Sequence, residues 1–415
     1  MHRDEIRIQS FLKLGYFIDY EVKRYPLDFS RIDKAAYRGA TAAELIPIGI
    51  DKLRATFSAL FQTGREHVVP ISGGLDSRLI LGALLEFTEA RNIHTYTFGI
   101  PRTYDYDLGC LVAKEMGTRH STFSLDQITY HEDELLDFAR RSDCQALQFN
   151  HPPIWELDRR FGSSVLWSGY VGDAVAGSHL HDPPSSTLID AQRLHIKNRS
   201  QVRSTRLHTC SDEAFLPYVG GGSQDPERLT YDEQVLFGEA VAKFTEPLVL
   251  FRGPNYRTPL INTPWMDFMF SVPNEYRLGE ALMIQIAQHA FPKLFGLPSK
   301  NSLGFGLGVR PEILGVMRYV NKMRKLIHQF IPAVSYPHVL YNDFNEGIRR
   351  SPDLRNIVLA NIAALKRRKI VDFVDFDGLV KRHMSRLRNH GDALIVLASL
   401  ELVLRAKESQ LGGVP

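Results

Sequence analysis

The feature that most constrains the fold is a glycine-containing turn between an apolar strand and an apolar helix. Residues 68–71 predict a buried strand, residues 72–77 read Ser-Gly-Gly-Leu-Asp-Ser, and residues 79–85 predict a helix. A strand, a glycine-rich turn and a helix together aim backbone N–H groups and the positive end of a helix dipole at an anion. We therefore predict a phosphate-binding loop made of Ser72, Gly73, Gly74, Asp76 and Ser77.

The loop is not the Walker type, because no lysine follows its glycines. An aspartate in a phosphate cradle makes chemical sense when it holds a Mg²⁺ that bridges to the phosphates, so we assign Asp76 to the metal. The residues S-G-G-L-D-S resemble the pyrophosphate-binding loop of the ATP pyrophosphatases, which cleave ATP between its α and β phosphates. The alternative is an ordinary turn between a strand and a helix.

Strands and helices alternate after this loop. Further strands are predicted over residues 93–99, 121–125 and 164–167, and helices over residues 106–116, 132–141 and 153–160. This alternation predicts an α/β fold with a parallel sheet, helices on both faces and a ligand beyond the carboxyl ends of the strands. The end of the second strand, Thr97, Phe98 and Gly99, would meet adenine, unless it is a plain strand end.

A second glycine turn, Ser168 to Gly177, follows the strand at residues 164–167. Gly169 would approach the nucleotide, and Asp173 would be a second carboxylate for Mg²⁺, although Asp173 also fits the N-cap of a following helix. Residues 178–228, rich in Ser, His, Pro and Gly, predict an irregular loop that serves as a mobile lid.

The rest of the chain predicts helices, at residues 230–250, 280–291, 313–331 and 354–369, and an earlier helix at residues 41–60 begins with a capping box. We divide the chain into an extension packed on the core (1–60), a nucleotide domain (61–310) and a largely helical C-terminal region (311–415).

Charge, hydropathy and cysteine content indicate in which compartment the protein works and which partners it lacks. The 415 residues carry a net charge of +3, and no apolar run approaches the roughly 20 residues of a membrane span. Cys110, Cys144 and Cys210 lack the spacing of metal ligands and suit a reducing compartment. The polar N-terminus shows no secretory signal. We therefore expect a cytoplasmic protein without a nucleic-acid or membrane partner.

Five segments together resemble the synthetase domain of the asparagine synthetase family, which includes the β-lactam synthetases and lasso-peptide cyclases. They are the 72–77 loop, Phe98-Gly99 with 105–120, Ser168–Gly177, Pro264–Asp267, and Lys300 with Gly304-Phe305-Gly306. The resemblance implies an adenine nucleotide alpha hydrolase-like fold of the HUP type. It also implies ATP and Mg²⁺, held in part by Asp76 and Asp173.

The implied reaction joins a carboxylate to ammonia or an amine. The carboxylate attacks the α-phosphorus of ATP, and the acyl-adenylate then gives an amide and AMP, with pyrophosphate released. Asp173, Lys300 and Tyr170 would be the catalytic residues, with Lys300 stabilising negative charge. The acceptor is a small-molecule or peptide carboxylate.

Four departures accompany this resemblance. The family's catalytic Glu or Asp is Tyr170 here, a phenol and thus a poor base at neutral pH, and the next family acid is Ala174. Lys300 precedes Gly304 by four residues where the family usually has two. His2 follows Met1 where a glutaminase domain has its Cys, so we expect nitrogen from ammonia, an amine or a separate glutaminase.

Two other functions stay open. Tyr170 and Ala174 are compatible with a catalytically degenerate ATP-binding module of a biosynthetic complex. An RNA-modifying ATP pyrophosphatase is a further alternative, although it usually needs paired cysteines and a basic face, and neither is evident.

Overall fold

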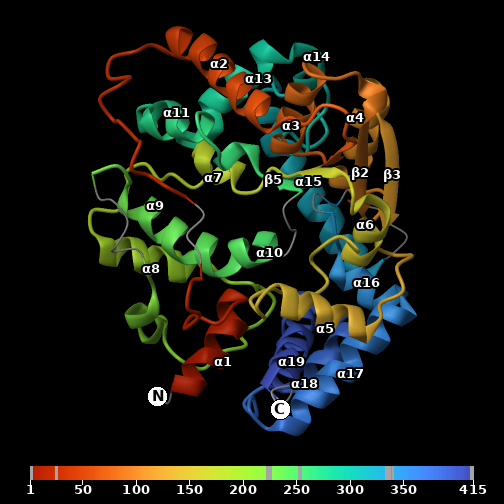
Figure 1. Cartoon of the computed structure of the whole chain (residues 1–415). Helices are drawn as coiled ribbons and strands as arrows, with labels where there is room; N and C mark the ends of the chain where they lie inside the picture. The colour runs from red at the N-terminus through yellow and green to blue at the C-terminus, as the bar shows by residue number, and fades with distance from the viewer. Residues whose placement is uncertain are drawn as a thin grey trace.

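The computed structural model describes residues 3–23, 27–220, 227–250, 255–331, 338 and 341–411. Its centre is a five-stranded sheet in the order β3-β2-β1-β4-β5, in which all neighbouring strands are parallel (Figure 1). The strands are β1 (His67–Pro70), β2 (Ile93–Gly99), β3 (Arg119–Ser124), β4 (Val165–Trp167) and β5 (Tyr256–Arg257). The predicted parallel sheet is confirmed, and β5 is a short edge strand that the sequence did not reveal.

Helices cover both faces of the sheet, as predicted. Val69 packs with Leu53 and Leu79 on one face, whereas its neighbour Val68 packs with Phe138 and Leu157 on the other. Successive side chains of a strand point to opposite faces, so an all-apolar strand needs cover on both. In Figure 1 the first face lies above the sheet and the second below it. The first layer includes α2 (Ala42–Leu60), α3 (Asp76–Leu85), α4 (Tyr104–Met116), α11 (Trp265–Ser271), α13 (Ala281–Ala290) and α14 (Pro292–Phe295), and the second α5 (Glu132–Arg141) and α6 (Ile154–Phe161).

Residues 178–228 are not the irregular lid that their composition suggested. They contain α8 (Leu188–Asn198), capped by Thr187, and a 3₁₀ helix (Asp212–Tyr218); residues 221–226 lie outside the described residues. Ile196 and Phe215 are fully buried in a cluster with α1 (Arg3–Leu14). Burial against a distant helix orders this segment, and the composition of the segment itself cannot show that contact.

Several short helices lie between residues 172 and 277. The predicted 230–250 helix is continuous and contains a π-helical stretch between α9 and α10. Short helices are α7 (Gly172–Ala176), α9 (Tyr231–Val235), the π-helix (Leu236–Thr245), α10 (Glu246–Leu250) and α12 (Asn274–Arg277).

The C-terminal helices form a second core beside α5. They are α16 (Phe344–Arg350), α17 (Pro352–Arg368), α18 (Phe376–Met384) and α19 (Gly391–Leu411), whereas α15 (Pro311–Phe330) precedes them and none of its described side chains belongs to this core. In Figure 1, α1 lies beside this group, and α1 contacts α19. Within the described part of the chain, no helix combines the length and the apolar character that crossing a membrane requires.

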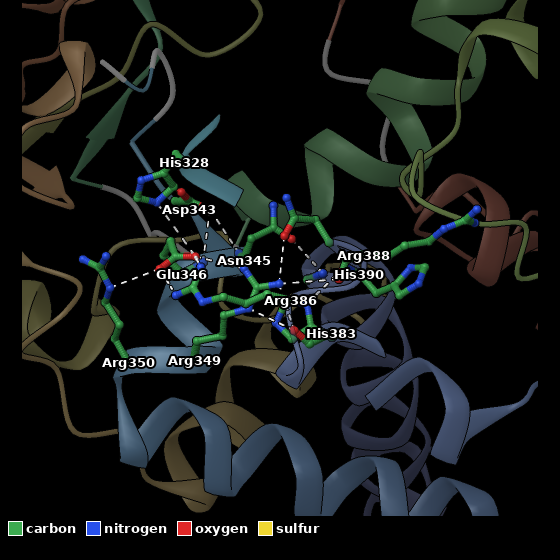
Figure 2. A network of polar contacts seen from close by, with 12 residues as sticks. His328, Asp343, Asn345, Glu346, Arg349, Arg350, His383, Arg386, Arg388 and His390 are labelled. Carbon is green, nitrogen blue, oxygen red and sulfur yellow. Dashed lines mark hydrogen bonds and ion pairs between the residues drawn. The ribbon is translucent and has the colours of Figure 1, made fainter. Parts of the chain in front are cut away.

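A polar network around Glu346 fastens α16 to the rest of this region (Figure 2). Arg386 binds both carboxylate oxygens of Glu346, at 2.8 and 2.9 Å, and Arg349 donates at 2.9 Å. His328, near the end of α15, lies 3.9 Å from the same carboxylate. Burial opposes ionisation, but the two arginines prevail and lower the pKa of Glu346 to about 2.

We expect Glu346→Gln to lower the free energy of unfolding by about 3 kcal/mol at neutral pH. The pKa of Glu346 is about 2 in the folded state and 4.5 as its reference value. This stabilisation is therefore complete above about pH 4.5 and disappears as the pH falls towards about 2. Urea denaturation of both proteins across this pH range measures the difference.

Glu132→Gln is the matched control for this prediction. Glu132 pairs with Arg405 through a side chain that is 42% exposed, and such surface pairs contribute about 0–1 kcal/mol. A Glu346→Gln variant with an unchanged, pH-independent stability would contradict the assignment of this network as a structural anchor.

Candidate active site

The sheet order places two loops at one point. β1 lies between β2 and β4. The strands before β4 are added to one side of β1 and the strands from β4 onward to its other side, and open parallel sheets bind ligands at such a switch in strand order. The 72–77 loop follows β1, and the turn at residues 168–172 follows β4. A cavity of about 440 Å³ lies at this position, lined by Pro70, Ile71, Ser72, Gly74, Leu75, Asp76, Ser77, Phe98, Asp105, Gly169, Asp173, Glu280, Lys300, Asn301 and Tyr341.

The 72–77 loop is held in an open shape by its own polar groups. The Gly74 N–H donates to the Ser72 hydroxyl at 3.2 Å, and the Ser72 and Ser77 hydroxyls are 3.4 Å apart. The Gly73 N–H donates to the Asp105 carbonyl at 3.1 Å. A Cβ at Gly73 would lie 2.8 Å from the Tyr104 carbonyl oxygen, so only glycine permits this approach. Ser72, Gly74 and Ser77 thus line the cavity together, as a phosphate-binding loop requires.

Lys300 lies over this loop despite its unusual sequence spacing. Its backbone N–H donates to the Gly73 carbonyl at 3.0 Å, and its Nζ lies 2.8 and 3.1 Å from the Asp105 carboxylate oxygens. A turn accommodates the additional residues before Gly304, with the Leu303 N–H donating to the Lys300 carbonyl at 3.0 Å. The lysine therefore reaches the loop by local folding of the segment that carries it.

Arg78 joins the 72–77 loop to the segment that precedes Lys300. Its guanidinium is fully buried and donates to the carbonyls of Leu297, at 3.0 Å, and Pro298. A third contact, at 3.5 Å, reaches the Gly73 carbonyl. Arg78 is thus a positioning residue that keeps the lysine segment on the 72–77 loop.

Asp76 and Asp173 approach each other across the cavity. Burial first, and then the charges of Asp173 and Glu280, raise the pKa of Asp76 well above its usual value. Its Oδ1 is buried and has no hydrogen-bond partner. A Cβ on Gly169 would lie 2.6 Å from the Asp76 Cβ, so glycine is needed beside this carboxylate.

Asp173 is the better solvated of the pair. Burial opposes ionisation, but His179, the Ala174 N–H at 2.8 Å and the Ser178 hydroxyl at 3.3 Å act together to lower the pKa of Asp173. An unpartnered buried carboxylate oxygen beside a second carboxylate fits Mg²⁺, which proteins usually bind through one or two carboxylates and substrate phosphates. No group of three or more His, Cys, Asp or Glu side chains in the described residues is arranged to hold a metal.

Three cavity residues were not predicted from the sequence. Glu280 and Tyr341 come from segments without a recognised motif, and Asn301 directly follows Lys300. Glu280 begins α13, and both Gly279 (φ 62°) and Glu280 (φ 66°) are left-handed. Burial and the Asp173 charge raise the pKa of Glu280 to about 7, with His179 opposing. Among the described residues, no group donates a hydrogen bond to its carboxylate.

The expected adenine edge is only partly exposed to the cavity. Phe98 lines the cavity, and its ring lies 5.1 Å from the Tyr341 ring. The Thr97 hydroxyl instead donates to the Ile71 carbonyl at 2.8 Å and is buried. Gly99 (φ 144°) permits close contact with the Tyr341 backbone, whose carbonyl accepts from the Ile100 N–H at 2.8 Å.

Tyr170 lies in the hydrophobic core and not along the described cavity lining. Its hydroxyl donates to Glu246 Oε2 at 3.0 Å, and burial followed by the Glu246 charge raises its pKa. This raised pKa makes the phenol still less able to act as a base.

We expect Tyr170→Phe to reduce amide formation by less than the 10²–10⁴-fold typical of losing a general base, about 10-fold at most. Stability should fall by about 1 kcal/mol, because a buried hydrogen bond to Glu246 is lost. Tyr20→Phe is the matched control, since that hydroxyl donates to Asp143 at 2.9 Å away from the cavity. An intact adenylation step with a complete loss of amide formation would instead identify Tyr170 as catalytic.

The fold and the loop define a class: a HUP-like nucleotide-binding α/β domain followed by a helical C-terminal part. Residues 51–298 match the family described as asparagine synthase. The chain therefore belongs to the asparagine synthase family, a family of ATP-utilising ligases. Comparison with curated proteins gave no match.

Proposed function

We propose that this protein is an AMP-forming amide ligase that adenylates a carboxylate and joins it to ammonia or an amine. The observation that carries the proposal is the convergence of the 72–77 loop, Asp173 and Lys300 on one cavity. A phosphate-binding loop, an acidic pair and a lysine are what adenylation requires, because negative charge builds on the phosphates as pyrophosphate leaves.

The 72–77 loop, the two aspartates and Lys300 have roles in the first step. Asp76 and Asp173 would hold Mg²⁺, which supplies charge neutralisation to the phosphates when bound. The 72–77 loop donates hydrogen bonds to the leaving pyrophosphate, and the Lys300 ammonium stabilises its charge. A substrate carboxylate oxygen attacks the α-phosphorus, and the bond to the pyrophosphate oxygen breaks.

The second step needs a proton acceptor, and Glu280 is the cavity carboxylate that fits. Asp105 pairs with Lys300, whereas Glu280 has no hydrogen-bond donor among the described residues. The amine nitrogen attacks the acyl carbon, the bond to AMP breaks, and the proton from nitrogen passes to the Glu280 carboxylate. A pKa of about 7 suits a general base at neutral pH.

The proposal also includes the nitrogen source, the acceptor and the cellular compartment. Free ammonia, an amine or ammonia from a separate glutaminase would supply nitrogen, and the acceptor is a small-molecule or peptide carboxylate. Met1 and His2, on which the glutaminase expectation rests, lie outside the described residues. A cytoplasmic setting is supported by Cys110, Cys144 and Cys210, which are all free thiols.

One observation favours a second candidate, the degenerate ATP-binding module. Tyr170 replaces the family acid and its hydroxyl is engaged by Glu246. Such a module would bind ATP without forming an adenylate.

The two candidates are separated by ATP–pyrophosphate exchange with a panel of carboxylic acids. The ligase should incorporate labelled pyrophosphate into ATP with one class of acid, and with an added amine should release AMP. ATP binding without exchange for any acid would support the degenerate module, and release of ADP and phosphate would contradict the AMP-forming chemistry.

A further inference from the structure

Helix α15 presents a broad apolar face to solvent. Eight of the fifteen large apolar side chains that the described residues expose lie on this helix or directly after it, each 37–66% exposed. They are Ile313, Val316, Tyr319, Val320, Met323, Leu326, Ile327 and Ile331. Large exposed apolar patches on soluble domains usually mark interaction surfaces.

The exposed side chains form one stripe along the helix. Their spacing of three and four residues, as in Val316, Val320, Met323 and Ile327, places them on one side, and the stripe spans about 140° at 100° per residue. The less exposed residues, including Leu314 and Asn321, lie on another line of the helix. The apolar stripe therefore points away from the protein.

The end of the helix is anchored on the side away from this stripe. His328 belongs to the less exposed line and joins the Glu346 network, 3.9 Å from the carboxylate (Figure 2). The stripe is thus held outward by contacts on the opposite side, which makes it a fixed surface of the folded protein.

Basic side chains border the stripe. Lys322 and Arg324 flank it on its two sides, and Arg318 and Lys325 lie further round the helix. Glu312, the single carboxylate of the helix, lies within the span of the stripe in the first turn, so the helix carries four cations and one anion. An apolar face with cationic flanks is the pattern of helices that lie in the interface of a membrane.

We propose that α15 binds the surface of an anionic phospholipid membrane, with its apolar stripe in the head-group boundary and Lys322 and Arg324 beside lipid phosphates. Their aliphatic stems can cover the apolar side chains while the charges reach the head groups. A second copy of the helix is a poorer occupant, because its flanks would bring like charges together. The binding is independent of the proposed amide ligase activity.

The sequence led us to expect no membrane partner, because the whole chain has a net charge of only +3 and no span-length apolar run. Neither property excludes a helix that lies on a membrane surface. Periodicity shows that a helix is amphipathic, and only the packed structure shows which side of it faces water.

Vesicle sedimentation tests the proposal with the full chain. The protein should bind vesicles of phosphatidylcholine mixed with phosphatidylglycerol, bind pure phosphatidylcholine weakly, and dissociate as salt is added. A variant with Val316→Glu and Met323→Glu should lose binding. A variant with Lys322→Gln and Arg324→Gln should bind about 30-fold more weakly, at about 1 kcal/mol for each cation near the surface.

The matched control carries Ile370→Glu and Phe373→Glu, which replace two apolar residues of similar exposure away from α15. It should bind mixed vesicles as the unmodified chain does. Equal loss in this control, or no vesicle binding by a monomeric unmodified chain, would overturn the proposal. Light scattering that shows a dimer dissociated by Val316→Glu with Met323→Glu, without vesicle binding, would identify the stripe as a self-association surface instead.

Discussion

An Asp76→Asn variant should lose binding of ATP·Mg²⁺ and fall by at least about 10³-fold in ATP–pyrophosphate exchange, while its fold becomes more stable. The carboxylate is buried, one of its oxygens has no partner, and its charge is opposed by Asp173 and Glu280. In the ligand-free protein the ionised form of Asp76 is therefore unfavourable, and a bound cation relieves this. We expect the melting temperature without ligand to rise by about 2 °C or more.

Calorimetric titration with ATP·Mg²⁺ and thermal unfolding measure the two effects on the same samples. Asp51→Asn, an exposed acid on α2, is the control and should change neither. Undiminished ATP·Mg²⁺ binding by Asp76→Asn would refute the metal assignment. A lower melting temperature would refute the conclusion that the carboxylate destabilises the empty site.

A Glu280→Gln variant should keep adenylation but lose amide formation with ammonia by about 10²–10⁴-fold. Glutamine has the same shape and cannot accept the proton that the attacking nitrogen must release. The pKa of Glu280 is raised to about 7, so the base form increases with pH up to and above that value. The amide rate per neutral ammonia molecule should therefore increase with pH through this range in the unmodified enzyme and stay level in the variant, whereas the concentration of neutral ammonia increases with pH in both assays.

Exchange and amide formation are measured separately, with the acid that supports exchange. Hydroxylamine is a weaker base than ammonia, so its nitrogen loses its proton to water more readily after attack, and Glu280→Gln should reduce hydroxamate formation less than amide formation. Glu275→Gln, an exposed acid on α12, is the control and should behave like the unmodified chain. A loss of exchange in Glu280→Gln would assign Glu280 to the nucleotide, and unchanged amide formation would remove it from the mechanism.

The sequence predicted the fold correctly in those segments whose hydrophobic pattern matches the way they pack in the structure. The apolar run at Val68 and Val69 and the alternation that follows it required a parallel sheet covered on both faces, and that is the structure. The capping box of Thr41 and Glu44 marked the start of α2. The same approach gave a wrong prediction for residues 178–228, because Ile196 and Phe215 are ordered by packing against α1, nearly 200 residues away.

The candidate site divides in a similar way. The 72–77 loop, Asp173 and Lys300 follow recognisable local motifs, and the structure brings them to one cavity. Glu280 and Tyr341 have no such motif. Glu280 lines the cavity from the turn before α13, and Tyr341 lines it through the contact of its backbone with Gly99 and Ile100. Tyr170 directly follows Gly169, which lines the cavity, yet Tyr170 itself is held in the core, where its hydroxyl binds Glu246.

The sequence by itself determined the glycine turn at residues 72–77, the sheet that presents it and the family to which the chain belongs, because glycine turns and strand periodicity are local properties of neighbouring residues. Only the tertiary structure decided that Arg78 links the segment before Lys300 to the loop, that Glu280 lies near Asp173, and that the apolar side of α15 faces water. Each of these depends on which distant surface a segment packs against. That choice is made by the burial of the whole chain, and no local pattern encodes it.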